Sequence, residues 1–232
     1  RGGYVRLEAG TASHTGRIRT SNQDSVGLVD GLYVVADGMG GHRGGEVASA
    51  EAVAAMLAVF DRRDRAGLVA AVRSANRTIL EKTVTRPDLS GMGTTLCALA
   101  VVSSASGDEV LAVANIGDSR VYRLRHGCLE RLTSDHSWVR EQVQSGALSA
   151  AMADQHPWRN IVTRALSGDN DMEVDISEGP LETGDRLLLC SDGLFAVLGD
   201  KGIERLLGLE DPLQQVCDVL VKEVNCGGGP DN

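Results

Sequence analysis

The stretch "VVADGMGGHRGGE", residues 34–46, sets five glycines around one aspartate, Asp37, and one histidine, His42. It follows an apolar run and leads into an alanine-rich segment, so it predicts a strand, a loop and a helix in that order. The loop has two interpretations. Either its backbone N–H groups wrap a phosphate, or the carboxylate of Asp37 binds a metal and the glycines let the chain turn.

The segments around this loop predict a layered α+β protein. Two strands joined at Asp30-Gly31 precede it, and two amphipathic helices, near residues 45–60 and 66–84, follow it. Short strands at close spacing come next, which is typical of antiparallel pairing. The tail predicts two further helices, the second with Asp211 as N-cap and Pro212 at its first position.

This order of elements is not a regular alternation of strand and helix. It favours a four-layer α/β/β/α sandwich, with two antiparallel sheets packed centrally and helices on both outer faces. We expect one domain over residues 1–232. A more polar, helical stretch at about residues 137–160, the flap, interrupts the strand pattern as an insertion and contains both tryptophans, Trp138 and Trp158. We expect these two side chains to anchor the flap on the body of the domain.

Composition excludes several classes of protein. A net charge of −9 argues against a nucleic-acid or anionic-membrane surface, because such surfaces need clustered Lys and Arg. The five cysteines are scattered without a C-x-x-C pair, which favours a reducing, cytoplasmic setting over a disulfide framework or zinc site. No apolar run reaches the roughly 18–20 residues that a membrane-spanning helix needs.

Four aspartates follow apolar or glycine-rich runs where strands are expected to end: Asp37, Asp118, Asp192 and Asp231. Each of them also fits a turn, since Asp before Gly or Ser is a common turn signal. Carboxylates gathered at one point repel one another unless cations neutralise them. Together they therefore predict a site for hard divalent cations such as magnesium or manganese.

Six short motifs then occur in order along the chain: "RTSNQD" (19–24), "VVADGMGGH" (34–42), "GMGTT" (91–95), "NIGDSR" (115–120), "LLCSDGL" (188–194) and "GGGPDN" (227–232). Together they resemble the metal-dependent, 2C-type Ser/Thr protein phosphatases in their compact bacterial form. The resemblance covers essentially the whole chain. It implies a phosphoprotein phosphatase that uses two divalent cations, manganese or magnesium, with a third at a weaker site.

The resemblance also implies roles for individual residues. Asp37 bridges the two metals, the Gly38 carbonyl binds one of them, and Asp192 and Asp231 bind the other. Asp24 holds metal-bound water. The third metal maps to Asp118 and Asp192 with Asn160 beside it, although Asn160 also fits a helix cap or turn.

Arg19 matches the clamp on the substrate phosphate, since a guanidinium binds two phosphate oxygens at once. His42 fits either a general acid or a histidine that only packs the loop. A hydroxide shared by the metals then attacks phosphorus directly, so no cysteine acts as nucleophile. The resemblance further implies phosphorylated protein partners, including a bacterial Ser/Thr kinase, a monomer, and an apolar strand after residue 232.

Two other functions remain to be weighed. A dinucleotide or P-loop site needs G-x-G-x-x-G or Gly-Lys-Ser/Thr, and Arg43 stands where the third glycine belongs. A non-catalytic relative acting as a binding or sensing module is the other, and the presence of Asp37, Asp192 and Asp231 argues against it.

Overall fold

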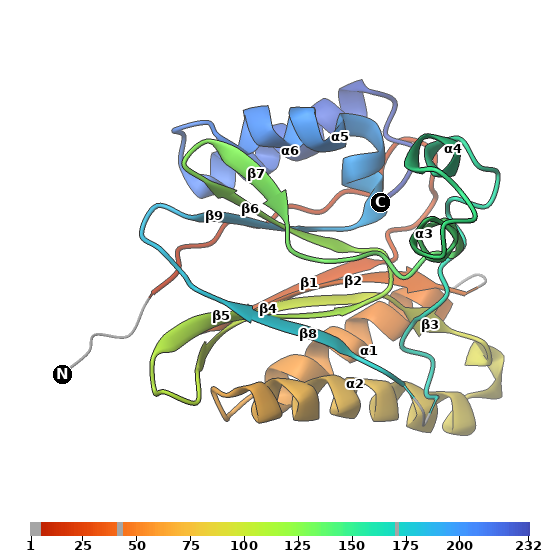
Figure 1. Ribbon diagram of the computed structural model, residues 1–232. Coiled ribbons are helices and arrows are strands. Elements are labelled where there is room, and N and C mark those ends of the chain that lie inside the picture. Colours follow the sequence, from red (N-terminus) through yellow and green to blue (C-terminus); the bar gives the residue numbers. More distant parts are fainter. Residues whose placement is uncertain (1–5, 41–43, 170–171) are drawn as a thin grey trace.

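The computed structural model describes residues 6–40, 44–169 and 172–232 of the chain (Figure 1). Its larger sheet has the order β1-β2-β4-β5-β8, with the short β3 also paired to β2. These strands are β1 (Asp24–Val29), β2 (Leu32–Met39), β3 (Gly93–Thr94), β4 (Leu96–Ser103), β5 (Glu109–Ile116) and β8 (Asp175–Gly179). The smaller sheet, ordered β7-β6-β9, comprises β6 (Arg120–Arg125), β7 (Cys128–Arg131) and β9 (Arg186–Cys190).

Helices cover the outer face of each sheet, and Figure 1 shows one pair below the two sheets and another pair above them. The larger sheet carries α1 (Gly44–Val59) and α2 (Arg65–Thr85), with the 3₁₀ turn Pro87–Leu89 after them. The smaller sheet carries α5 (Asp192–Leu207), kinked at Gly199, and α6 (Leu213–Cys226). Every strand pair in the described residues is antiparallel. The predicted α/β/β/α sandwich is therefore confirmed.

The core is divided among the layers. Small side chains of α1 and α2, such as Ala48 and Ala71, pack on one face of the larger sheet. Leu99 and Val113 on its other face meet Val121 of the smaller sheet. Alternate residues of β4 and β5 thus point into different layers, and most are apolar because both faces are covered. This rigid sandwich positions the loops at one end of the sheets.

Three local predictions differ from the structure. β2 does not end at Asp37, because Gly38 and Met39 continue it by pairing with Thr94 and Gly93 of β3. Asp192 is the first residue of α5, one residue after the Ser191 that follows β9. The N-cap of α6 is Pro212 rather than Asp211.

The flap is helical as predicted, with α3 (Trp138–Gln144) and α4 (Ala150–Asp154). Trp138 and Trp158 pack edge-to-face on each other at 4.8 Å between ring centroids, and Trp138 also packs on His156. These ring contacts lie within the flap, and anchoring of the flap on the body by the two tryptophans stays a prediction. A backbone bridge between Ser137 and Val162 joins the two ends of the flap.

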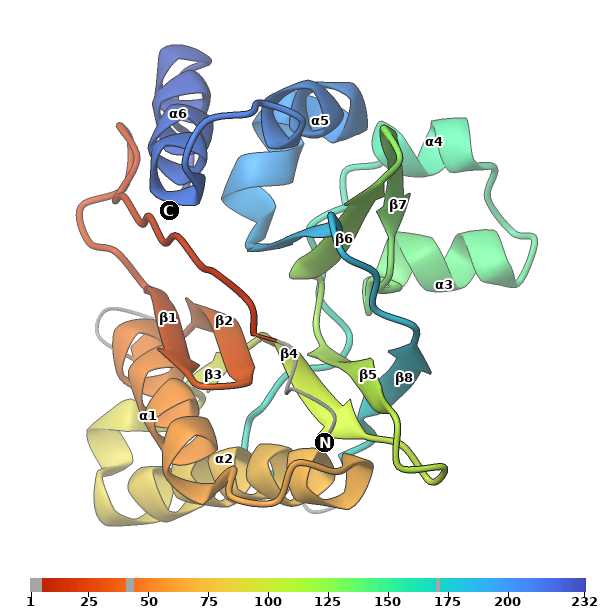
Figure 2. The ribbon, with the colours of Figure 1, turned by 90° about the vertical axis from the view of Figure 1, so that its left-hand side faces the viewer.

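The segment before β1 lies beside α6. Thr11 exchanges two hydrogen bonds with the Gln214 side chain, through Thr11 N (3.1 Å) and Thr11 O (2.8 Å). Figure 2 shows this red segment crossing the open side of the sandwich between β1 and α6. None of the described helices combines the length and apolar character needed to cross a bilayer.

Candidate metal centre

Five aspartates converge at one end of the sandwich: Asp24, Asp37, Asp118, Asp192 and Asp231, here named the acidic cluster. Asp24 and Asp37 are directly opposite each other on β1 and β2. Asp118 follows β5, Asp192 follows β9, and Asp231 lies in the loop after α6. All four predicted strand-end aspartates are thus brought together, and Asp24 joins them.

Thr95 and Gly38 hold Asp37 in place. The Asp37 N–H donates to Thr95 Oγ1 (2.9 Å), and Asp37 O accepts from Thr95 N–H (2.8 Å) and Thr94 Oγ1 (2.8 Å). A Cβ at residue 38 would lie 2.0 Å from the Gly45 carbonyl oxygen at the start of α1. Only glycine therefore lets α1 approach β2 so closely.

Asp24 has one oxygen bonded and one without a partner. Its Oδ2 accepts a hydrogen bond from Ser191 Oγ at 2.6 Å, which connects β1 to the loop before α5. Its buried Oδ1 has no hydrogen-bonding partner among the described residues. A buried carboxylate oxygen without a donor is costly, and a cation or a water ordered by a cation satisfies it.

The Asp118 loop is fixed by side chains on both sides. Ser119 Oγ, completely buried, lies 2.8 Å from Thr95 Oγ1 and so connects this loop to the support of Asp37. Arg120 makes a bidentate ion pair with Asp135 (2.9 and 2.6 Å), and its guanidinium stacks 3.6 Å from the Phe195 ring centroid on α5. This stacking holds the loop and the helix of Asp192 together.

The end of the chain places Asp231 beside α5. A Cβ at residue 193 would lie 2.1 Å from Asn232 O, so the chain passes tightly over the N-terminus of α5. Asp231 Oδ2 accepts a hydrogen bond from Arg19 Nη2 at 2.6 Å. The predicted phosphate clamp is therefore ion-paired with a predicted metal ligand in this structure.

The acidic cluster is electrostatically strained. Shielding from water, followed by repulsion from the other four aspartates, raises the pKa of Asp37. Shielding from water, followed by repulsion from neighbouring aspartates, also raises the pKa values of Asp24 and Asp192, and raises that of Asp118 to about 7. The positive charge of Arg19 acts on Asp231, Asp192 and Asp37. Neutralising the whole cluster requires additional positive charge.

The donor set fits hard divalent cations. Carboxylate oxygens and a backbone carbonyl such as that of Gly38 are ligands that magnesium and manganese accept. Among the described residues, no group of three or more Asp, Glu, His or Cys side chains is already close enough together to hold a metal ion. The carboxylates are thus neighbours that stay apart, as expected for like charges.

Two of the predicted site residues are not included in the cluster described above. His42 lies outside the described residues. Asn160 is exposed at the end of the flap, with no side-chain hydrogen bond to a described residue. Its role at a third metal stays a prediction.

Sequence reasoning missed the residues that support the cluster. Asn232 joins several segments, because its Oδ1 accepts from Gln23 N–H and its Nδ2 donates to Thr15 O and Ser21 O. Thr95, Ser191 and Asn232 lie inside the motifs quoted above, and that was the available signal. His136 lies outside those motifs.

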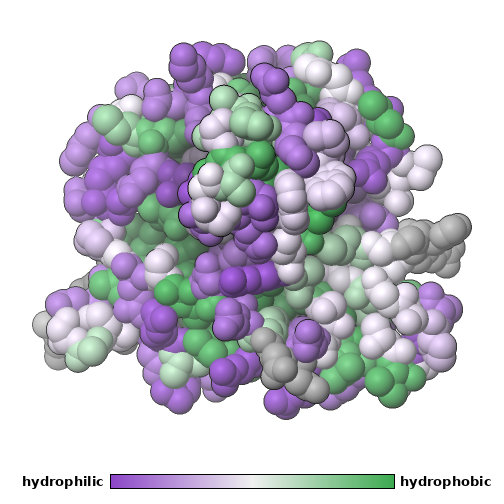
Figure 3. Space-filling view, turned by 45° about the vertical axis from the view of Figure 1, so that its right-hand side comes forward, coloured by the Kyte–Doolittle hydropathy of each residue, from purple (hydrophilic) through white to green (hydrophobic). Residues whose placement is uncertain are grey.

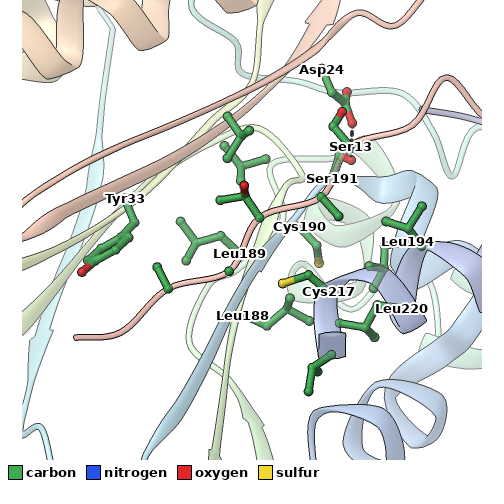
Figure 4. A pocket seen from close by; sticks show the side chains of 18 of the residues that line it. Ser13, Asp24, Tyr33, Leu188, Leu189, Cys190, Ser191, Leu194, Cys217 and Leu220 are labelled. Atoms are coloured by element: carbon green, nitrogen blue, oxygen red, sulfur yellow. Dashed lines mark hydrogen bonds between the residues drawn. The ribbon is translucent and has the colours of Figure 1, made fainter. Parts of the chain in front are cut away.

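A cavity of about 250 Å³ adjoins the cluster, with Asp24 and Asp231 among its lining residues. Figure 4 shows the apolar side chains of β9 and α6 lining it, with Asp24 and Ser191 at one end. The segment before β1 and the edge strands β1 and β9 also contribute to its walls. Such an apolar lining does not bind a phosphate, so the acidic cluster is the site of interest.

Comparison with known proteins identifies the family of this chain. The family model described as "Protein phosphatase 2C" matches residues 13–225. The chain belongs to this family. The serine/threonine phosphatase stp of Listeria monocytogenes is 37% identical over 232 residues, covering 94% of this chain and 89% of that protein. The chain is therefore a metal-dependent Ser/Thr protein phosphatase of the 2C family.

Solved structures of the family support the fold. The crystal structure of the Mycobacterium tuberculosis phosphatase PstP/Ppp superposes with a TM-score of 0.91 at 38% identity, covering 98% of this chain and 96% of that chain. A structure of the catalytic domain of PstP, 37% identical with a TM-score of 0.84, is in complex with two manganese ions and covers 95% of this chain and 92% of that one. Membership of this family argues against the dinucleotide or P-loop function weighed for residues 34–46.

Proposed function

We propose that this chain hydrolyses phosphoserine and phosphothreonine in proteins at the acidic cluster, with two divalent cations, manganese or magnesium. Asp37, the Gly38 carbonyl, Asp192 and Asp231 would hold them, and Asp24 would order water. A third cation would bind at Asp118 and Asp192 with Asn160. The convergence of five carboxylates, four of which repel Asp37, carries this proposal, together with the two manganese ions of the similar PstP domain.

The chain's own residues bind and orient the substrate. When bound, the cations lower the pKa of a water molecule and neutralise charge on the phosphoryl oxygens. Arg19, half exposed and 2.6 Å from Asp231, is placed to exchange that carboxylate for two phosphate oxygens. Asp24, oriented by Ser191, is placed to accept a hydrogen bond from the attacking water. His42 stays a candidate proton donor to the leaving Ser or Thr oxygen.

Direct attack by water needs no cysteine. Cys190 lies two residues before Asp192, but burial raises the pKa of its thiol to about 12. Its sulfur therefore stays protonated and is a poor nucleophile. We expect phosphate release without a phosphocysteine intermediate.

The flap supports a protein as substrate. Met152, Trp158 and Ile161, at or beside the flap, expose 59%, 52% and 45% of their surface. Figure 3, which brings the flap side forward, shows hydrophobic residues interspersed with hydrophilic ones on that face. Such a mixed surface suits a transient protein contact. The proposal also includes a Ser/Thr kinase among the substrates and action as a monomeric single domain. It places the protein in the cytoplasm, in keeping with its five free cysteines.

Phosphate release from a phosphothreonine peptide tests the proposal. We expect turnover with manganese, none in EDTA, and far slower release from the matched phosphotyrosine peptide. Asp192→Asn removes a proposed metal ligand and should abolish turnover, whereas Cys190→Ser should retain it. Full activity in EDTA, or inactivity of Cys190→Ser with a normal fold, would contradict the proposed mechanism.

A further inference from the structure

His136 is a buried histidine with both ring nitrogens engaged. It is 6% exposed and lies in the loop between β7 and α3. Its Nδ1 accepts a hydrogen bond from the Gly117 N–H at 3.1 Å, and its Nε2 lies 2.9 Å from Asp175 Oδ2 on β8. Because Gly117 donates to Nδ1, the ring proton is assigned to Nε2, where Asp175 accepts it.

The backbone of His136 connects two other segments. Its N–H donates to Gly117 O at 2.9 Å, so both polar backbone groups of Gly117 bind this one histidine. Its carbonyl oxygen accepts from the Thr163 N–H at 2.8 Å, at the closing end of the flap. The next hydrogen bond, from Trp138 N–H to Ile161 O at 2.9 Å, continues the pairing of the flap ends.

Gly117 directly precedes Asp118 of the acidic cluster. Its φ of +104° is accessible to few residues other than glycine, and a Cβ there would lie 2.7 Å from Thr95, the residue that holds Asp37. The Gly117 backbone therefore has little room to move on the Thr95 side. On its other side, the hydrogen bonds to His136 determine the direction in which Asp118 leaves β5.

From this arrangement we propose that His136 is a positioning residue for Asp118. By binding Gly117 at two points, it holds the Asp118 carboxylate toward the acidic cluster and connects that loop to the base of the flap. Asp175 keeps the imidazole in the tautomer that can accept from Gly117. This inference rests on the proposed role of Asp118 as a ligand to a cation, and it adds a residue that does not itself touch the cation.

Two substitutions separate the roles of the two ring nitrogens of His136. In His136→Asn the side-chain oxygen falls near the position of Nδ1 and can still accept from Gly117. In His136→Gln the amide falls near Nε2 and can reach Asp175 but not Gly117. A purely structural role would make both variants similarly unstable, whereas a positioning role makes only His136→Gln lose binding at the Asp118 site.

Calorimetric titration with manganese measures this directly. The step that Asp118→Asn removes defines the Asp118 site. We expect His136→Gln to weaken that step at least about tenfold, as loss of outer-sphere partners of a metal ligand typically does, and His136→Asn to stay within about threefold of wild type. The remaining steps should be unchanged. If His136→Gln does not fold, Asp175→Ala tests the same claim by removing the partner that orients the ring, with weakening expected at the same step.

Asn76→Ala is the matched control. Asn76, 8% exposed, accepts the N–H of Gly168 at 2.9 Å, so it also holds a positive-φ glycine, but away from the acidic cluster. It should lower the melting temperature without changing any manganese step. Equal weakening in Asn76→Ala and His136→Gln, an unchanged Asp118 step in His136→Gln, or no step lost in Asp118→Asn would overturn the inference. Inactivity of wild type toward phosphopeptides would instead overturn the proposed function.

Discussion

Two carboxylates near opposite ends of β9 differ in the charges that surround them. Asp185, with a side chain 2% exposed, receives two hydrogen bonds of 2.6 Å from Arg125, which lower its pKa. Asp192, at the other end, is shielded from water and repelled by Asp231, and its pKa is raised. The fold neutralises the first group with its own arginine. We propose that the second group, with the cluster around it, is neutralised by cations from solution.

The largest expected effect is that of a substitution within the acidic cluster. Asp37→Asn removes the central carboxylate of the cluster, so activity in saturating manganese should fall at least about 100-fold. The metal-free protein should melt at a higher temperature, because repulsion within the cluster decreases. Initial rates on a phosphothreonine peptide and thermal unfolding in EDTA measure the two effects.

Asp185→Asn is the matched control, and it should lower stability while leaving activity nearly unchanged. It leaves Arg125 without its bidentate partner, which costs about 1–3 kcal/mol of unfolding free energy. Activity per folded molecule should stay within about twofold, given the separation of independent sites. A lower melting temperature for Asp37→Asn in EDTA would contradict the picture of a cluster under repulsion.

The stability of the metal-free protein should depend on pH in opposite directions for the two regions. The pKa of Asp118 is about 7 in the folded chain against an ordinary 3.8, so the folded state holds its proton more tightly. This contribution is complete below about pH 4 and is lost as pH rises through about 7. The pKa of Asp185 is lowered, so its contribution is present above its ordinary value and is lost in acid.

Thermal unfolding in EDTA at pH 5 and pH 8 tests this sign. Wild type should lose stability toward pH 8 through the cluster, and Asp118→Asn should show a smaller loss. Asp185→Asn should leave the difference between these two pH values unchanged, because Asp185 is ionised at both. An unchanged difference in Asp118→Asn would show that Asp118 does not titrate in this range.

The smallest effect concerns Arg19, the one cation seen in contact with the cluster among the described residues. Its ion pair with Asp231 is partly exposed, and such pairs contribute about 0.2–1 kcal/mol. A metal that binds Asp231 must displace it, so Arg19→Gln should bind manganese up to about fivefold more tightly. The same variant should have a higher KM for phosphopeptide, because the phosphate loses its guanidinium.

Arg17→Gln serves as the control for Arg19, since Arg17 has no ion pair among the described residues. It should change neither manganese affinity nor KM. Weaker manganese binding in Arg19→Gln would mean that Arg19 helps to assemble the site rather than competing for it.

The sequence alone was sufficient to predict the layers and the cluster, for identifiable reasons. Asp30-Gly31 determined the hairpin register that places Asp24 opposite Asp37. Apolar runs before Asp118 and Asp192 marked strands whose ends meet. These are local signals, and the family motifs supplied the roles of the aspartates.

The supporting residues could not be predicted, because their roles depend on contacts between distant segments. His136 and Asp175 lie 39 residues apart, and Ser191 and Asp24 lie 167 apart. The ion pair of Arg19 with Asp231 likewise needed the folded end of the chain. The continuation of β2 past Asp37 was missed because the two-residue partner β3 is too short to recognise as a strand.

Anomalous scattering from a manganese-soaked crystal tests the central claim most directly. We predict two strong peaks within ligand distance of Asp37, one of them also bound by Asp192 and Asp231, and a weaker third peak beside Asp118. Soaked crystals in which the carboxylates of the cluster bind no manganese, or in which manganese binds only elsewhere, would contradict the account.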